Sequence, residues 1–234
     1  MPERVVVITG ASSGIGARTA REAHDRGYHI VLTARSADKL ESLAADLRGP
    51  NQACAVPCDI SRWADVARLR DTALSAFGRI DAVFANAGQW VPTSFLNPTT
   101  EPDDWRNMVL ANVLGPALIA RAFVPDLVVT KGHLVLTGSV AGRIVVPGQL
   151  YPATKWAITG MAQSIRAEIA HTGVKTTVIQ PGLVDTGTAA ADRSHEPMLD
   201  PGAIANAFFY AIEQPGDVDV NEIVIRPAGQ RPDR

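Results

Sequence analysis

Residues 9–16 read Thr9-Gly10-Ala11-Ser12-Ser13-Gly14-Ile15-Gly16, and this stretch decides the fold. It follows a β-branched apolar run and precedes a segment of helical composition at 17–26. Glycines permit a tight strand-to-helix turn and let a pyrophosphate approach the backbone, while a helix N-terminus offers free N–H groups. A lone glycine-rich loop can be an ordinary turn. Its place at the first strand–helix junction predicts a dinucleotide site.

The same alternation continues along the rest of the chain. Short apolar runs are separated by helix-length amphipathic stretches, which favours parallel strands with helices on both faces of one sheet. The predicted strands are 5–9, 29–34, 53–58, 81–85, 133–137, 175–180 and 222–226. We therefore expect an α/β, Rossmann-like doubly wound sheet of about seven strands in a single domain, 1–234. Two long stretches that follow strands, 88–103 and 182–201, are predicted to form pocket walls and a lid.

Composition narrows the function classes. The chain has 234 residues, 46% of them hydrophobic, with a formal net charge of -2 and a pI near 6.2. Basic residues are scattered, so nucleic acid is not expected as a partner. The start of the chain, 1–8, does not resemble a signal peptide, and no apolar stretch approaches the roughly 20 residues needed to cross a bilayer. We expect a cytoplasmic protein with no membrane partner.

The cysteines and histidines do not predict a metal site. Cys54 and Cys58 lie in one predicted strand, so their Cα atoms should be about 13 Å apart, too far for a disulfide. They are expected to be buried thiols. The five histidines show no ligand spacing and are expected on the surface or in loops.

The end of the second strand bears on cofactor choice. An acid there commonly holds the ribose 2'-hydroxyl of NAD, whereas an Arg accommodates the 2'-phosphate of NADP. The chain has Ala34 followed by Arg35, which favours NADP(H). A solvated surface arginine remains the alternative.

Taken in order, these residues resemble the short-chain dehydrogenase/reductase family over essentially the whole chain. The family's Thr-Gly-x3-Gly-x-Gly pattern matches 9–16, and Asn86-Ala87-Gly88 resembles its Asn-Asn-Ala-Gly turn, with Ala85 in place of the first Asn. The remaining matches are Asp59, Asn112, Ser139, Tyr151 with Lys155, and Pro181-Gly182.

The resemblance implies a residue set for the cofactor and a set for catalysis. The catalytic set is Asn112, Ser139, Tyr151 and Lys155. The cofactor set is Gly10, Ser12, Ser13, Gly14, Ile15, Gly16, Arg35, Asp59, Ile60, Asn86, Ala87, Gly88, Tyr151, Lys155, Pro181, Gly182, Val184 and Thr186. In the family, the lysine also binds the nicotinamide ribose, and the asparagine holds a water that relays protons to it.

The Tyr–Lys pair can also be judged from its spacing. Residues four apart share a helix face, so the ammonium of Lys155 should lie near the phenol of Tyr151. A free tyrosine has a pKa of about 10, and a neighbouring cation favours phenolate. Tyr151 can then serve as general acid in reduction and general base in oxidation. An exposed helical i,i+4 pair is the structural alternative.

Ser139 and Asn112 have structural alternatives of their own. Ser139 is expected to hydrogen-bond the substrate oxygen, or else to be a turn serine. Asn112 is either part of the site or a helix asparagine with ordinary partners. Ser139 and Tyr151 are 12 positions apart, one fewer than the family spacing, and the shortening falls within 147–150. If the serine role shifts, Thr137 is the fallback.

These features predict an oxidoreductase that transfers a hydride between NADP(H) and an aldehyde, ketone or small hydroxy acid. Candidate substrate-facing residues are Trp90, Ser139, Gln149 and Leu150, although a Trp after a strand often only packs. The alternative is an NADP(H)-binding sensor without turnover. The related epimerase branch usually has a longer chain. The apolar helices at 103–130 and 151–171 predict a homodimer or homotetramer.

Overall fold

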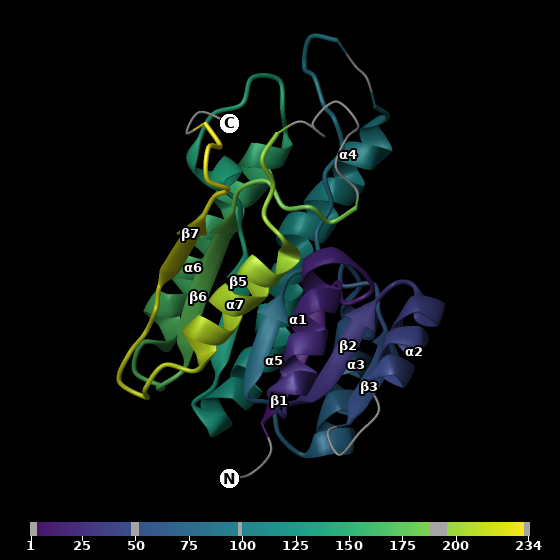
Figure 1. Ribbon diagram of the computed structural model, residues 1–234, viewed down its shortest axis with the longest axis vertical. Coiled ribbons are helices and arrows are strands. Elements are labelled where there is room, and N and C mark those ends of the chain that lie inside the picture. Colours follow the sequence, from purple (N-terminus) through teal and green to yellow (C-terminus); the bar gives the residue numbers. More distant parts are fainter. Residues whose placement is uncertain (1–3, 48–51, 98–99, 188–195, 232–234) are drawn as a thin grey trace.

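The computed structural model describes residues 4–47, 52–97, 100–187 and 196–231 (Figure 1). Its strands are β1 (Val5–Thr9), β2 (His29–Ala34), β3 (Ala53–Pro57), β4 (Ala82–Ala85), β5 (His133–Thr137), β6 (Lys175–Pro181) and β7 (Glu222–Ile225). Each predicted strand is confirmed, and each end agrees to within one residue.

The strands form one parallel sheet in the order β3-β2-β1-β4-β5-β6-β7. This confirms the doubly wound, Rossmann-like fold. The strand order changes direction between β1 and β4, which pair with Ile8 opposite Phe84. Ligands of open α/β sheets bind where the carboxyl ends of two such strands separate. The fold therefore places the turn at 9–16 and the turn at 86–88 at this point.

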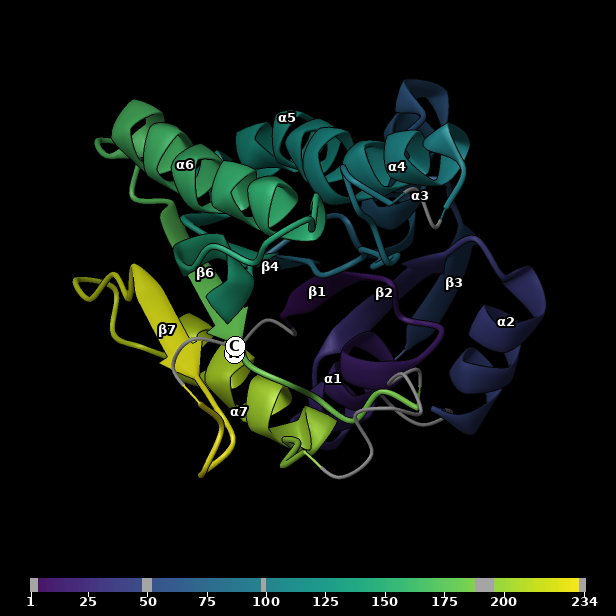
Figure 2. The ribbon, with the colours of Figure 1, turned by 90° about the horizontal axis from the view of Figure 1, so that it is seen from above.

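Helices cover both faces of the sheet. They are α1 (Gly14–Asp25), α2 (Ala37–Asp46), α3 (Trp63–Phe77), α4 (Pro102–Val109), α5 (Gly115–Thr130), α6 (Tyr151–Ile169) and α7 (Pro201–Ile212). Seen from above, α3, α4, α5 and α6 lie on one side of the sheet, and α1, α2 and α7 lie on the other (Figure 2). Alternate residues of β1 enter two separate cores, with Val5 and Val7 in one and Val6 and Ile8 in the other. Because both faces are buried, the strands read as continuous apolar runs.

One helical segment is longer and more apolar than expected. Helix α4, a π-helical turn (Leu110–Leu114) and α5 follow one another across 102–130. By length and composition this segment could cross a membrane, which corrects the expectation that no apolar stretch is long enough. Its most apolar window is 44% buried, and Ile119, Phe123 and Leu127 pack into the core beside the sheet. The apolar composition of this segment is therefore also typical of a helix that buries one side in a protein core.

His133 corrects the expectation that the histidines lie on the surface or in loops. It begins β5 and is buried, with Nε2 2.7 Å from the hydroxyl oxygen of Thr177 on β6. Thr177 donates to the carbonyl oxygen of Val220, so its oxygen accepts the Nε2 proton. Burial, assisted by the charge of Lys175, lowers the pKa of His133 to about 3. The ring is therefore neutral at physiological pH.

The two cysteines are free thiols, as expected. Cys54 lies within β3 and is partly buried, and Cys58 follows the strand and is buried. Burial raises the pKa of Cys58 to about 11, so its thiol is protonated and unreactive at neutral pH.

Candidate active site

Thr9 joins the carboxyl ends of β1 and β4. Its hydroxyl lies 3.3 Å from the carbonyl oxygen of Phe84 and accepts hydrogen bonds from the backbone N–H groups of Asn86 and Ala87, each at 2.9 Å. The side chain of Asn86 donates back to the carbonyl oxygen of Thr9 at 3.0 Å. The two turns predicted to bind a cofactor are therefore one connected unit.

The glycine-rich turn has no room for side chains at its closest points. A Cβ on Gly16 would lie 2.3 Å from the carbonyl oxygen of Gly10, and one on Gly10 would lie 3.0 Å from the Cα of Ala87. Gly10 and Gly14 also have positive φ angles of +69° and +50°. Ser13 makes no side-chain capping bond to α1, and the first turn of the helix has no acidic residue. This helix N-terminus suits an anion.

Arg35 lies directly after β2 and is exposed. Within the described ranges it pairs with no carboxylate. An open cavity of about 340 Å³ is lined by residues of α1 and α2, among them Arg21 and Lys39, together with Ser12 and two aspartates. Arg35 thus holds an exposed guanidinium at the end of β2, without a carboxylate partner among the described residues.

Asp59 and Ile60 follow β3 and differ in what they can offer a ligand. The carboxylate of Asp59 accepts hydrogen bonds from the backbone and the hydroxyl of Ser61, at 3.0 Å and 2.7 Å. Ile60 is buried against α5, where a Cβ on Gly115 would lie 2.5 Å from its Cδ1. Ile60 can therefore present only its backbone to a cofactor.

Tyr151 and Lys155 lie one turn apart at the start of α6. The ammonium of Lys155 donates to the carbonyl oxygen of Thr137 at 2.9 Å and lies 5.6 Å from the centre of the Tyr151 ring. Burial lowers the pKa of Lys155 to about 8 and raises the pKa of Tyr151 to about 12. The expected depression of the Tyr151 pKa by Lys155 is not seen: burial raises the pKa, and the opposing contribution comes from Ser139. At neutral pH the phenol is protonated and the ammonium is charged.

Ser139 reaches Tyr151 despite the short spacing between them. Its side chain lies near enough to the phenol to oppose the rise in the pKa of Tyr151. Ser139 also caps the short helical turn Val140–Arg143 by accepting from the N–H of Ala141 at 3.1 Å, and it lies 3.4 Å from the carbonyl oxygen of Pro181. It is therefore a turn serine and a neighbour of the phenol at once.

Thr137, the fallback for Ser139, is engaged elsewhere. Its carbonyl oxygen accepts from Lys155, and its hydroxyl lies 3.3 Å from the side-chain oxygen of Asn86. It therefore links the lysine to the turn at 86–88, and the position beside the phenol belongs to Ser139.

Asn112 lies in the π-helical turn that interrupts the long helix, and it is buried. Its amide binds both backbone groups of Gln89, accepting from the N–H and donating to the carbonyl oxygen, each at 2.8 Å. It also donates to the hydroxyl of Thr154 at 3.1 Å. A Cβ on Gly88 would lie 3.0 Å from the Asn112 Oδ1 and 3.7 Å from the Lys155 Nζ, so these three residues meet.

The predicted lid begins at the end of β6. The backbone N–H of Gly182 donates to the carbonyl oxygen of Ile225 at 2.7 Å, and Val184 pairs with Leu199 in a parallel bridge. Thr186 packs against the glycine-rich turn, since a Cβ on Gly14 would come within 2.9 Å of its methyl group. The two stems of the segment are thus joined. The run Ala189-Ala190-Ala191 lies outside the described residues.

The proposed substrate-facing residues lie on the two loops beside Tyr151. Trp90 is exposed, while Gln149 and Leu150 are partly buried. Both contact Thr93, a buried residue that the sequence analysis did not single out. No sequence motif marks Thr93, because its partners lie more than fifty residues away.

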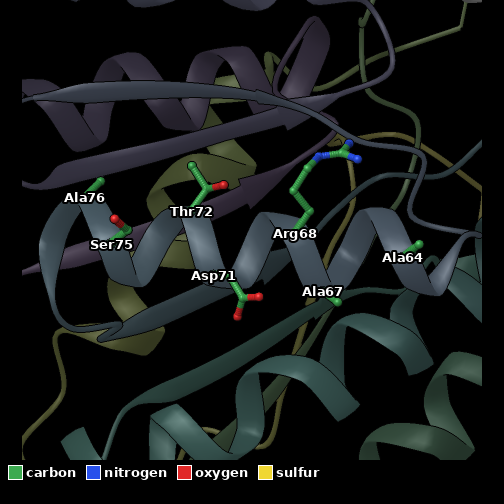
Figure 3. Close-up of a pocket in the computed structure, with 7 residues that line it drawn as sticks. All are labelled: Ala64, Ala67, Arg68, Asp71, Thr72, Ser75 and Ala76. Carbon is green, nitrogen blue, oxygen red and sulfur yellow. The ribbon is translucent and has the colours of Figure 1, made fainter.

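An open groove of about 630 Å³ runs along α3, lined mainly by small side chains, and Figure 3 shows Arg68 and Asp71 pointing to opposite sides of that helix. None of its lining residues belongs to the predicted site. Among the residues the structure describes, no three His, Cys, Asp or Glu side chains group as a metal site would require.

Comparisons with known proteins agree with this fold. Residues 4–197 match the family model described as short chain dehydrogenase. An uncharacterized oxidoreductase of Staphylococcus aureus (strain N315) is 37% identical over 230 residues, covering 97% of this chain and 98% of the relative. Among solved structures, an alcohol dehydrogenase from the archaeon Thermococcus sibiricus, complexed with 5-hydroxy-NADP, has a TM-score of 0.90, 31% identity and 98% coverage of both chains. Serine dehydrogenase from Escherichia coli has a TM-score of 0.86 and 27% identity, covering 97% of this chain and 99% of its own.

Proposed function

The chain belongs to the short-chain dehydrogenase family, and on that basis we propose that it is an NADP(H)-dependent oxidoreductase that interconverts a carbonyl compound and an alcohol. The cofactor, when bound, supplies or accepts the hydride. The substrate class that we propose is an aldehyde, a ketone or a small hydroxy acid. Two solved relatives are named for an alcohol and for serine, which carries a hydroxyl group, and this supports the choice.

The residues present fit a dinucleotide. Gly16 lies close to Gly10 and neither has a side chain, so a pyrophosphate can approach the backbone of this turn. The N-terminus of α1 also has no side-chain cap. The cofactor would be held by this turn and by the segments that border it, at Asp59, Ile60, Asn86, Ala87, Gly88, Pro181, Gly182, Val184 and Thr186. Each of these segments lies at the carboxyl end of a strand.

The preference for NADP(H) rests on Arg35. Its guanidinium has no carboxylate partner among the described residues, so it can pair with a 2'-phosphate without first breaking an ion pair. The solved alcohol dehydrogenase from Thermococcus sibiricus contains an NADP derivative, which supports the same choice.

Tyr151 is the proposed general acid and base. Because its pKa is raised to about 12, the phenol keeps its proton at neutral pH and can donate it to the oxygen of a carbonyl undergoing reduction. Ser139 would donate a hydrogen bond to the same oxygen and stabilise the charge that develops on it. The single observation that carries this assignment is the ammonium of Lys155 held 5.6 Å from the centre of the Tyr151 ring, with Ser139 near enough to the phenol to oppose the rise in its pKa.

Lys155 and Asn112 would support the proton transfer. The ammonium lies on the same side of α6 as the phenol, and Asn112 lies beside it next to Gly88. We propose that Lys155 binds the nicotinamide ribose and that a water held by Asn112 returns a proton to the lysine. Both side chains are buried, which favours fixed positions over exchange with bulk solvent.

The test is binding followed by turnover. Fluorescence titration with NADPH and NADH should give a lower Kd for NADPH, and a panel of aldehydes, ketones and 3-oxo acids should then oxidise the bound NADPH. NADPH binding without turnover on any member of the panel would favour the alternative function, a sensor of NADP(H).

We also propose a homodimer or homotetramer. Helices α5 and α6 lie side by side on one face of the sheet (Figure 2). The helical segment 102–130 exposes Val109, Leu114, Val128 and Val129, and α6 exposes Trp156. Burying these side chains between subunits would stabilise an oligomer. Light scattering that reports a monomer would contradict this proposal.

A further inference from the structure

Thr93 binds the segment that leads into α6 through three hydrogen bonds. Its hydroxyl donates to the carbonyl oxygen of Gly148 at 3.0 Å and accepts from the backbone N–H of Leu150 at 2.7 Å. Its own carbonyl oxygen accepts from the side-chain amide of Gln149 at 3.1 Å. Thr93 is 3% exposed, so water cannot readily replace these bonds.

The bound segment determines where α6 begins. Gly148 has a φ of +75°, which makes a sharp turn, and Leu150 is the N-cap of α6, directly before Tyr151. Leu150 provides no side-chain cap for the helix. The hydroxyl of Thr93 satisfies a donor and an acceptor that this tight turn would otherwise leave unpaired. The position of Tyr151 therefore depends on a residue 58 positions earlier.

A second set of bonds fixes the same two segments to each other. Asn112 holds both backbone groups of Gln89, four residues before Thr93, and also donates to the hydroxyl of Thr154. That hydroxyl donates to the carbonyl oxygen of Tyr151 at 2.7 Å. The segment 89–93 is thus attached to the start of α6 at both of its ends. Within this arrangement, the hydroxyl of Thr93 contacts Gly148 and Leu150 directly, through hydrogen bonds between uncharged groups.

We propose that Thr93 is a positioning residue for Tyr151. By closing the turn 148–150, its hydroxyl sets the start of α6 and so keeps the phenol within reach of Ser139. The inference rests on the proposed function, because it assigns Tyr151 the proton transfer. It implies that loss of the hydroxyl slows the chemical step far more than it weakens cofactor binding, since Thr93 makes no hydrogen bond to the turn at 9–16 and Lys155 keeps its own bond to Thr137.

The test compares Thr93→Val, which keeps the shape and loses the hydroxyl, with Thr93→Ser, which keeps the hydroxyl. Thr100→Val is the matched control, because Thr100 lies in the same loop and also makes two side-chain hydrogen bonds, to Pro92 and Trp105. We expect Thr93→Val to lower kcat roughly tenfold to a hundredfold, with the Kd for NADPH within about twofold of wild type. Thr93→Ser and Thr100→Val should stay within about threefold of the wild-type kcat.

A second readout does not need turnover. The chain has 3 tyrosines, so the ring signals of isotope-labelled tyrosine can be assigned with a Tyr151→Phe variant. The Tyr151 signals should shift in Thr93→Val and stay in place in Thr93→Ser and Thr100→Val. Unshifted signals in Thr93→Val, or a kcat that falls equally in Thr93→Ser and Thr93→Val, would overturn the proposal. If the wild type reduces no carbonyl at all, the proposed function fails, and the ring signals still decide whether Thr93 positions Tyr151.

Discussion

Lys155 holds its ammonium group 5.6 Å from the centre of the Tyr151 ring, one helical turn away on the same side of α6. The ammonium is held by a hydrogen bond to the carbonyl oxygen of Thr137, and Ser139 lies near the phenol. This pairing places a proton donor and a fixed positive charge at the carboxyl end of the sheet, and the first predictions follow from it.

Tyr151→Phe should abolish most of the activity without loss of cofactor affinity. The variant removes the hydroxyl alone, and general acid–base groups contribute about a hundredfold or more to the rate. We expect kcat to fall by at least about a hundredfold while the Kd for NADPH changes by less than about threefold, measured by initial rates and fluorescence titration. Tyr210→Phe, at an exposed position on α7, is the control and should behave as wild type. A Tyr151→Phe enzyme that keeps a tenth of its activity would refute the assignment.

Lys155→Met should change how stability depends on pH. Burial lowers the pKa of Lys155 from 10.5 to about 8, so between these values the unfolded chain holds a proton that the folded chain has released. The stability of the wild type relative to Lys155→Met should therefore rise with pH over this window, by about 2 kcal/mol between about pH 7 and about pH 9.5. Urea denaturation of both proteins at the two pH values measures it. A difference that stays constant or falls would contradict a buried, charged lysine.

Arg35→Ala should weaken NADPH binding selectively. A charge-assisted hydrogen bond contributes about 1.5–3 kcal/mol, so the Kd for NADPH should rise by about tenfold to a hundredfold. The Kd for NADH, which lacks the 2'-phosphate, should change by less than about threefold. Arg106→Ala, at an exposed position on α4, serves as the control. Equal effects on the two cofactors would show that Arg35 does not contact the phosphate.

His133 should make the protein sensitive to acid. Burial lowers its pKa from 6.5 to about 3. Below about pH 6.5 the histidine is therefore protonated in the unfolded chain but stays neutral in the folded chain. Stability should fall as the pH drops, with a contribution on the order of 3 kcal/mol between about pH 7 and about pH 4. His133→Gln keeps a donor for Thr177 and should lose this sensitivity in thermal melts. His171→Gln, at an exposed position, should retain it.

Gly16→Ala should damage the fold of the nucleotide turn. The added Cβ would lie 2.3 Å from a backbone oxygen, and a contact this close cannot be relieved by a side-chain rotation. We expect a loss of about 1–3 kcal/mol in the free energy of unfolding and no measurable NADPH binding. Gly216→Ala, at a position with open space, is the control and should leave both quantities near wild type. Normal NADPH binding by Gly16→Ala would argue against this turn as the cofactor site.

The strands and their parallel pairing were predictable because the sequence pattern that marks a buried strand is local. A parallel strand buried on both faces reads as an apolar run, as at 5–9 and 133–137, and the helix-length segments between such runs require parallel pairing. The position of the two turns followed as well, since Thr9 ends β1 and Asn86 follows β4, the strands that flank the change in strand order.

Features that depend on distant partners were not predictable from pattern. The role of Thr93 requires the turn at 148–150 to fold against it, and the π-helical turn around Asn112 leaves no mark in the apolar periodicity. His133 looked like a surface residue because its partner Thr177 lies on a strand 44 positions away. The Tyr151 pKa was predicted to fall because of the charge of Lys155, but burial, which depends on the whole fold, raises it.

The most direct test of the proposed reaction is the fate of the transferred hydrogen. NADPH labelled with deuterium at the reactive position of its nicotinamide is mixed with the protein and the best carbonyl substrate of the panel, and the product alcohol is examined by mass spectrometry. We predict an alcohol that carries deuterium on the carbon that was the carbonyl carbon. Oxidation of NADPH that leaves no label in the product, or tight NADPH binding with no alcohol formed from any member of the panel, would contradict an oxidoreductase that acts through Tyr151.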